Sequence, residues 1–334
     1  MSISYRPMRR EDVAECAGII GRHPFLGPRY GDAICHLAPV WSALLASDAC
    51  VSAVFEERRG NTCTILGGGI DVFVSCEFAE ALKTPPHFWI GPEIVRRICA
   101  GCSPVLTDRQ VGEANSSGRL YAAVWHTGVS PHDLARAEVG NTIHSAFNDL
   151  HSGYQLTEVV TQSDSRAHVE GICSIGLRCW NGTRGRYQPI EPAQTENLLA
   201  HPHVVGISRE VAASLSGCWA GSTFLYRPPH FGFRRSEQKL LSCGLLGGTD
   251  DEIADQLGIS LDAVRKTWRN IYDRVATVDP ELLPDTSSRR NRPRERGKGK
   301  KQRLLAYLHH HPEELRPISR KLLEPCSVRT TVRT

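Results

Sequence analysis

Residues 247–276 read GGTDDEIADQLGISLDAVRKTWRNIYDRVA, and this stretch determines how the C-terminal part of the chain is expected to fold. Thr249 can cap a helix, because its hydroxyl and the Glu252 carboxylate three residues later each satisfy an orphan backbone N–H. Gly258 supplies the left-handed residue that ends this helix, and Ser260 can cap a second one. The stretch therefore predicts two short helices joined by a tight turn.

The second predicted helix has one apolar and one polar face. Its apolar residues repeat at intervals of four, three and four, as a single helical stripe does: Val264, Trp268, Ile271 and Val275. The opposite face carries charged and amide side chains: Asp262, Arg265, Lys266, Arg269, Asn270 and Asp273. Such donors suit phosphates and base edges, so the pattern predicts a helix-turn-helix whose second helix enters the major groove. Ile259 is expected to fill the core beneath the turn.

A further helix is predicted just before this pair, over Ser236–Leu246. Together they give the run SEQKLLSCGLLGGTDDEIADQLGISLDAVRKTWRNIYDRV, which resembles the LuxR-type helix-turn-helix domain. The matching positions are Glu237, Gly247, the EIA at 252–254, the IS at 259–260, the VR at 264–265 and the NIY at 270–272. The resemblance implies a transcription regulator, and Pro280 and Pro284 predict that any fourth helix is short.

The resemblance also implies contacts with double-stranded DNA. The residues expected to make them are Thr249, Ser260, Arg265, Lys266, Thr267, Arg269 and Asn270. Two alternatives remain open for the same stretch: a plain helical hairpin inside a larger core, and the promoter-reading region of sigma factors. The NIYDRV sequence favours the LuxR-type interpretation over the second of these. Whether the chain forms a homodimer is left open.

The formal net charge of +4 conceals one strongly basic segment. Arg289–Arg303 holds nine Lys or Arg against one Glu, whereas Phe231–Ala276 is balanced, with seven basic and seven acidic residues. The basic segment has no apolar period and is rich in Pro and Gly, which predicts a disordered linker. Tethered beside a duplex, its arginines would also neutralise phosphates. We therefore expect nonspecific DNA affinity to depend on it.

Composition predicts a globular protein of two or three domains, with 40% hydrophobic residues in a chain of 334. The polar start MSISYRPMRREDV does not have the pattern of a signal peptide, so a cytoplasmic location is expected and the 12 cysteines are expected to be reduced. Cys99 and Cys102 form a lone CxxC, and no metal is expected because zinc would need two more ligands. The apolar stretch Ala33–Phe55 is interrupted by polar residues and a proline, so no membrane contact is expected.

The first two thirds of the chain alternate between strands and helices, which predicts a mixed α/β domain. Strands are expected at 49–57, 63–78 with a glycine-rich bend at 67–69, 118–129 and 154–162, and Pro131 is expected to open a long helix. This order resembles the layout of the GNAT acyltransferase fold, which implies a coenzyme A loop of the type [QR]xxGx[GA] at a helix N-terminus. Residues 124–143, VWHTGVSPHDLARAEVGNTI, lack such a loop, and Pro131 removes one donor. These features disfavour a catalytic acetyltransferase.

No catalytic set emerges from the sequence, and no cofactor is expected. His144 and Asp149 could meet a nucleophile such as Cys173, although sequence spacing does not place them together. The other histidines of this region are expected to be hydrogen-bonded within the fold or solvated: His126, His132 and His151.

The main hypothesis is a DNA-binding transcription regulator built from four segments. They are a sensory or interaction domain over 1–195 that takes a small-molecule or protein signal, a connecting segment over 196–230, a helix-turn-helix domain over 231–285, and a basic, largely disordered tail with a short helix over 286–334. One alternative is a GNAT-like acyltransferase with a helical appendage that binds nucleic acid or another partner. A second alternative is an interaction module whose helices bind protein.

Overall fold

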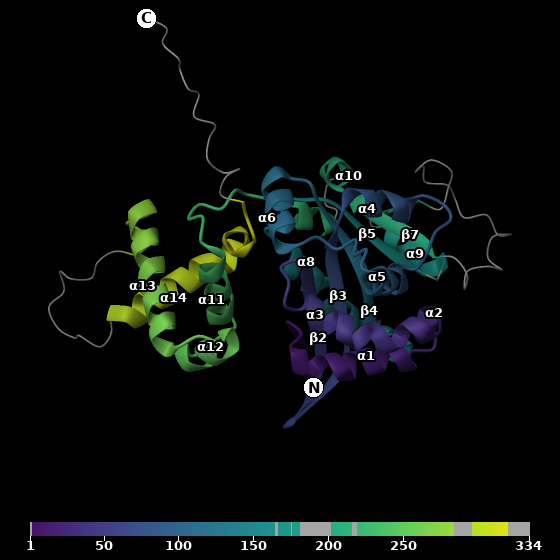
Figure 1. Cartoon of the computed structure of the whole chain (residues 1–334), viewed down its shortest axis with the longest axis horizontal. Helices are drawn as coiled ribbons and strands as arrows, with labels where there is room; N and C mark the ends of the chain where they lie inside the picture. The colour runs from purple at the N-terminus through teal and green to yellow at the C-terminus, as the bar shows by residue number, and fades with distance from the viewer. Residues whose placement is uncertain are drawn as a thin grey trace, which may run out of the picture. The chain divides into compact units, whose positions relative to one another are not determined.

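The structure, a computed structural model, describes residues 2–163, 166–174, 176–180, 202–215, 219–283 and 296–319. Its internal contacts divide the chain into two units, Met1–Leu225 and Tyr226–Thr334, here named the sheet unit and the helical unit. Figure 1 shows the strands of the sheet unit in purple to green and the helices of the helical unit in green to yellow. Residues 286–295 and 320–334 of the expected tail lie outside the described residues.

Seven strands of the sheet unit form one mixed sheet in the order β1-β2-β3-β4-β5-β7-β6. Neighbouring strands are antiparallel except β4 and β5, which run parallel. The strands are β1 (Ser2–Arg6), β2 (Cys50–Arg59), β3 (Thr62–Val74), β4 (Leu120–Val129), β5 (Leu156–Ser163), β6 (Arg178–Cys179) and β7 (His203–Ser208). This order and the parallel central pair fit the GNAT-like layout that the sequence predicted.

Helices pack on both faces of the sheet, because successive side chains of a strand point to opposite faces. Val72 and Val74 belong to one buried cluster with α1, α3 and α5, whereas Phe73 between them belongs to another with α6 and α8. The α-helices are α1 (Val13–Arg22), α2 (Gly27–Tyr30), α3 (Leu37–Leu44), α4 (Cys76–Lys83), α5 (Ile90–Cys99), α6 (Asp108–Ser117), α7 (Pro131–Leu134), α8 (Ala137–His151), α9 (Arg166–Ser174) and α10 (Arg209–Ser214). The 3-10 helices are η1 (Arg10–Asp12), η2 (Gly31–His36) and η4 (Trp219–Phe224).

The sheet unit differs from the sequence-based expectations in several local features. The strand expected at 63–78 ends at Val74, because the Ser75 hydroxyl accepts the Phe78 N–H and starts α4. Residues 67–69 lie within β3, where the irregularity is a shift in register with β2 beside Gly67 and not a bend. The long helix expected from Pro131 is divided into α7 and α8. Residues 196–230, expected to be a connection, contain β7 and α10 of the sheet unit.

The helical unit contains α11 (Arg235–Leu245), α12 (Asp250–Leu257), α13 (Leu261–Val278), α14 (Arg296–His310) and the 3-10 helix η6 (Pro312–Leu315). Thr249 and Glu252 form the predicted capping box, and the Ser260 hydroxyl accepts the Ala263 N–H at the start of α13. Gly258 ends α12 with a φ of 63°, a left-handed conformation that favours glycine. The predicted ends of these helices are therefore confirmed.

The core of the helical unit includes the predicted apolar stripe of α13. All four of its residues are buried: Val264, Trp268, Ile271 and Val275. Ile259 was expected to fill this core and does not, since it remains 40% exposed. Leu304 and Leu308 of α14 are buried in the core instead.

The basic segment was expected to be a linker, and from Arg296 onward this expectation is wrong. Residues 296–310 form α14, because Leu304 and Leu308 lie four apart and pack one side of that helix against the core. Lys301 also contributes, with its Nζ 3.0 Å from Asp250 Oδ1 and 4.8 Å from the centre of the Trp268 ring. Within the described residues, no helix is long and apolar enough to cross a membrane.

Residues near the two ends of the helical unit bind one another. The Glu314 carboxylate accepts the backbone N–H of His230 at 2.6 Å and that of Phe231 at 3.1 Å. The buried Gln238 side chain donates to the carbonyl oxygens of Glu314 at 3.1 Å and Arg316 at 2.6 Å. The segment after α14 is thus fixed to the segment before α11.

Candidate functional site at the split between β4 and β5

Strand β4 separates from β5 halfway along its length. The two strands pair from Leu120 with Leu156 to Ala123 with Val160 and no further, whereas the other edge of β5 pairs with β7 from Glu158 to Ser163. In the same region the register between β3 and β4 shifts, which leaves Trp125 as an extra residue in β4. The Asp71 carboxyl group accepts the backbone N–H of Trp125. A bulge and a split therefore coincide, and such irregular places are where sheets re-aim side chains.

The bulge aligns Trp125, Tyr30 and His126 in a chain of hydrogen bonds. The Trp125 indole Nε1–H donates to the Tyr30 hydroxyl at 2.5 Å, and that oxygen lies 2.7 Å from His126 Nε2. The Tyr30 hydroxyl already accepts a hydrogen bond from the indole. We therefore assign the Tyr30 hydroxyl as the donor in its hydrogen bond with His126 Nε2. His126 Nε2 is then the acceptor, and the neutral imidazole carries its proton on Nδ1.

Burial keeps this chain neutral at physiological pH. It raises the pKa of the Tyr30 phenol well above its usual range. It also lowers the pKa of His126 to about 3. The three side chains therefore hold a fixed set of protons near pH 7. His126 Nδ1 is itself buried and has no hydrogen-bond partner.

The loop before α5 forms the opposite wall of the split. Gln162 of β5 holds it in place, donating to Phe88 O at 2.5 Å and accepting from Ile90 N–H at 2.6 Å. Between those two residues lies Trp89, over whose ring the Arg29 guanidinium stacks at 3.7 Å. The Trp89 Nε1–H is buried without a hydrogen-bond partner. Gly91 follows, and a Cβ there would overlap both the Trp125 Nε1 and the Tyr30 hydroxyl.

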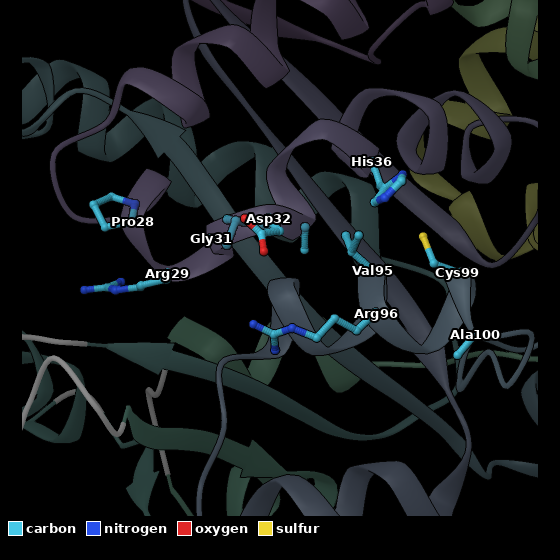
Figure 2. A pocket seen from close by; sticks show the side chains of 11 residues that line it. Pro28, Arg29, Gly31, Asp32, His36, Val95, Arg96, Cys99 and Ala100 are labelled. Carbon is cyan, nitrogen blue, oxygen red and sulfur yellow. The ribbon is translucent and has the colours of Figure 1, made fainter.

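Two cavities lie beside this group of residues and share Arg29 and Tyr30. The smaller, of about 40 Å³, is lined by Leu26, Arg29, Tyr30, Trp89, Gly91, Pro92, Trp125, His126 and Gln162. The larger, of about 740 Å³, is an open groove along α2, η2 and α5. Figure 2 shows residues that line the groove, among them Arg29 on α2 and Arg96 on α5. The smaller cavity has room for a group of a few atoms, and the groove has room for a larger molecule.

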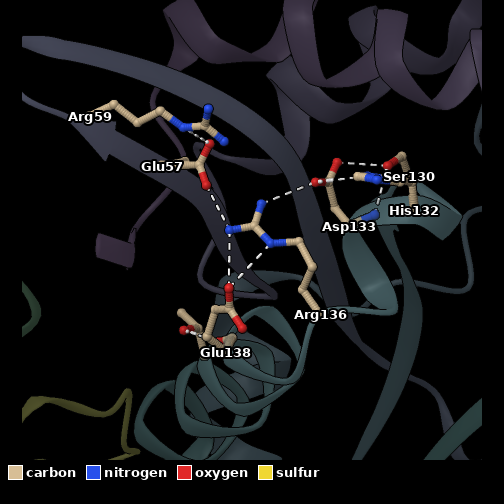
Figure 3. Close-up of polar contacts among 8 residues, drawn as sticks. Glu57, Arg59, Ser130, His132, Asp133, Arg136 and Glu138 are labelled. Carbon is tan, nitrogen blue, oxygen red and sulfur yellow. Dashed lines mark hydrogen bonds and ion pairs between the residues drawn. The ribbon is translucent and has the colours of Figure 1, made fainter. Parts of the chain in front are cut away.

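The turn after β4 is closed by side chains of the chain itself (Figure 3). The Ser130 hydroxyl accepts the Asp133 N–H at 3.1 Å and donates to the Asp133 carboxylate at 2.7 Å. Arg136, the residue before α8, lies 2.6 Å from Glu57, 3.3 Å from Asp133 and 3.3 Å from Glu138. Hydrogen bonds lower the pKa of all three carboxyl groups, chiefly from Arg136 to Glu57, from Ser130 to Asp133 and from its own backbone N–H to Glu138.

A GNAT-like fold implies coenzyme A, whose pyrophosphate would be held by free backbone N–H groups at this turn. The residues present do not fit that group. Pro131 has no N–H, the Asp133 N–H is already bonded to Ser130, and the Glu138 N–H faces its own carboxylate. Three ionised carboxylates around Arg136 would also repel a pyrophosphate.

The residues predicted to contact DNA belong to the helical unit and are mostly exposed. Arg265, Lys266, Arg269 and Asn270 lie on the exposed side of α13. The hydroxyls of Thr249 and Ser260 cap helices, and the Thr267 hydroxyl donates to Ala263 O at 2.8 Å. Arg265 Nη1 lies 3.5 Å from Asp262 Oδ1. Their contact with DNA stays a prediction.

The possible nucleophile set of His144, Asp149 and Cys173 occupies different surroundings. Asp149 accepts the Tyr5 hydroxyl at 2.5 Å, and His144 lies on the exposed side of α8. Cys173 packs in a small apolar cluster, and burial raises the pKa of its thiol, which disfavours a thiolate. Among the described residues, no group of three or more His, Cys, Asp or Glu could hold a metal ion.

The remaining histidines differ in their surroundings. The side chain of His132 is 91% exposed beside Asp133, whereas His151 is buried, with Nδ1 2.8 Å from Phe147 O and Nε2 3.4 Å from Asp71 Oδ2. His126 is the one that reaches the split. Sequence reasoning missed its partner Tyr30, which lies 96 residues earlier in the chain, and it missed the roles of Trp125 and Gln162 at the same site, because contacts between distant residues leave no local signal in the sequence.

Comparison with known proteins gives matches among solved structures alone. No family model and no curated protein matches the chain. The crystal structure of mosquito arylalkylamine N-acetyltransferase like 5b is 12% identical, with a TM-score of 0.36, over 62% of this chain and 100% of that one. A Drosophila melanogaster polyamine N-acetyltransferase, described as catalysing the formation of N-acetylagmatine, is 14% identical, with a TM-score of 0.30, over 61% and 97%.

These findings correct the main sequence-based hypothesis. The similar solved structures are N-acetyltransferases and not transcription regulators. None of the comparisons supports the interpretation of the chain as a LuxR-type transcription regulator. The GNAT-like layout is retained on the strand order of the sheet unit, which is a mixed α/β sheet flanked by helices.

Proposed function

We propose that the chain is a GNAT-like acyltransferase with a helical appendage that binds a partner. The observation that carries this proposal is the pair of buried N–H donors, Trp89 Nε1 and His126 Nδ1, whose side chains line one small cavity at the split between β4 and β5. Buried donors without partners are rare in native proteins and often mark a functional site. The split itself supports the same assignment, because it opens the centre of the sheet to a ligand.

We assign three side chains at the split a role in acyl transfer. The carbonyl oxygen of an acyl donor becomes negatively charged in the transition state, and fixed N–H donors in a dry cavity stabilise that charge. Trp89 and His126 would supply these donors. Tyr30 fixes the tautomer of His126 that leaves the proton on Nδ1, so Tyr30 acts as a positioning residue. The acceptor would enter through the groove along α2, η2 and α5, which shares Arg29 and Tyr30 with the small cavity.

The test is thiol release from acetyl thioesters, measured with a panel of amines as acceptors. We expect amine-dependent release from the wild-type chain. We expect a loss of about 10- to 100-fold in kcat for Tyr30→Phe, because this variant no longer fixes the proton on His126 Nδ1, and complete loss of one such donor costs about 10²-fold or more. Tyr5→Phe is the matched control, because it removes a hydroxyl hydrogen-bonded to Asp149 and should leave kcat unchanged. Absence of transfer to every amine, or equal rates in the two variants, would contradict the assignment.

For the appendage we propose a nucleic acid as the partner. The exposed side of α13 supports it, because Arg265, Lys266 and Arg269 lie there together. Lys301 of α14 also partly offsets the acidic start of α12 by pairing with Asp250. Binding to random-sequence duplex should weaken as salt rises, and Arg265→Ala should lower affinity more than Lys239→Ala, which also removes an exposed positive charge, but from α11. Salt-independent association, or equal effects of the two variants, would rule out this role for α13.

A further inference from the structure

The sheet unit combines an open acyl site with a closed turn where a nucleotide would be held. At the split, two buried donors and two cavities are available to a ligand. At the turn after β4, Ser130 and Asp133 satisfy one another and Arg136 is shared by three carboxylates. The two regions treat the two ends of an acyl donor differently. The split has room for its acyl end, whereas the turn after β4 excludes its pyrophosphate.

We infer that this chain selects its donor by the acyl end alone, and that it takes a thioester whose pyrophosphate, if it has one, stays outside the turn after β4. This inference rests on the proposed function. The reaction needs no other co-reactant: the acceptor amine attacks the thioester carbonyl carbon, the carbon–sulfur bond breaks, and the thiol leaves with the proton that the amine releases.

The closed turn is built from several independent contacts. Glu57 is nearly buried, with a side chain 8% exposed, and is bound by both Arg136 at 2.6 Å and Arg59 at 2.8 Å. Arg136 is 18% exposed and its charge is already offset by Glu57 and Asp133. A phosphate entering here would have to displace a carboxylate from Arg136 and the Asp133 side chain from Ser130. The phosphate would replace existing charge-assisted hydrogen bonds with similar ones, so its binding would release little free energy.

The first experiment compares acetyl-coenzyme A with S-acetylpantetheine, which has the same acyl end and no pyrophosphate. The two donors should show KM values within about threefold of one another on the full chain. A KM for acetyl-coenzyme A at least 30-fold lower would overturn the inference. Absence of transfer from both donors would overturn the proposed function, and the donor preference with it.

A second readout does not depend on activity. Hydrogen exchange of the peptide covering residues 129–140 is followed while 3′,5′-ADP or inorganic pyrophosphate is added. No added protection is expected there, even if these anions bind the basic helical unit. Added protection confined to residues 129–140 would contradict the inference that this turn excludes a pyrophosphate, whatever the kinetics show.

A charge-removing variant tests the cause of the exclusion. Asp133→Asn with Glu138→Gln removes two of the three carboxylates around Arg136, and we expect it to lower the KM for acetyl-coenzyme A relative to S-acetylpantetheine by roughly tenfold. The control, Glu77→Gln with Glu11→Gln, removes two exposed carboxylates from the first turns of α4 and η1. An unchanged donor ratio in the first variant would show that the carboxylates do not exclude the pyrophosphate.

Discussion

Replacing Asp71 by asparagine should remove a large part of the pH dependence of the sheet unit's stability. Burial raises the pKa of Asp71 to about 7, against roughly 3.9 in an unfolded chain. Between these values the folded state holds a proton that the unfolded state has released, so the free energy of unfolding falls as pH rises from about 4 to about 7 and is then level. At about 1.4 kcal/mol per pH unit, the loss over that window approaches about 4 kcal/mol.

The asparagine side chain would not titrate, and it keeps an oxygen that can accept the Trp125 N–H. The other titratable groups facing this position are His151, with Nε2 3.4 Å away, and Cys50. His151 and Cys50 are present in both the wild type and the variant, so both proteins keep the pH dependence of stability that these two groups cause. The difference in slope between the wild type and Asp71→Asn therefore belongs to Asp71.

The assay is hydrogen exchange of β3 and β4 peptides from pH 4 to 8, corrected for the intrinsic exchange rate at each pH. Local protection is preferred to global unfolding, because a chain of two units need not unfold in one step. The wild type should lose protection as pH rises from about 4 to about 7, and Asp71→Asn should lose much less over the same range. Asp149→Asn, which changes an exposed aspartate on α8, is the control and should behave as the wild type. Equal slopes in all three proteins would refute the reasoning.

Three further substitutions probe the site and the helical unit. Gly91→Ala should abolish amine-dependent thiol release while far-UV circular dichroism stays native, because the new Cβ overlaps Trp125 and Tyr30; retained release would place the reaction elsewhere. Thr249→Ala should destabilise α12 by about 1 kcal/mol through loss of its cap, whereas Thr249→Ser should not, as measured by exchange of α12 amides. Glu314→Ala should lower the stability of the helical unit by about 2 to 3 kcal/mol, because two backbone N–H groups lose their acceptor. A change under about 0.5 kcal/mol in urea unfolding would contradict that assignment.

The helical unit was predictable where its signals are local. Capping boxes, a left-handed glycine and a stripe at helical spacing all lie within a few residues of one another, and α12 and α13 begin where those signals place them. Helix α14 was not predictable in the same way. Its stability depends on Leu304 and Leu308 packing against helices that lie far earlier in the chain, so the local composition indicated a linker.

In the sheet unit, too, the elements were predictable from local signals and the contacts between distant residues at the site were not. Alternating residues predicted β2, β4 and β5, and the order of elements predicted the GNAT-like layout. The site itself depends on Tyr30 meeting Trp125 and His126, contacts that span 95 and 96 residues of sequence. They exist because a bulge in β4 turns two neighbouring side chains toward α2, and a bulge has no sequence signal as clear as a helix cap.

The contact between Glu314 and the backbone before α11 determines when the helical unit can fold during synthesis. Phe231 and Glu314 are separated by 83 residues, so α11, α12 and α13 leave the ribosome before their last structural partner has been made. The sheet unit precedes them and can fold first, as N-terminal domains generally do. A premature stop or frameshift between α13 and Glu314 would therefore not merely shorten the protein at its end. It would leave three helices exposing a core that nothing closes, and such a product is a target for proteolysis and aggregation.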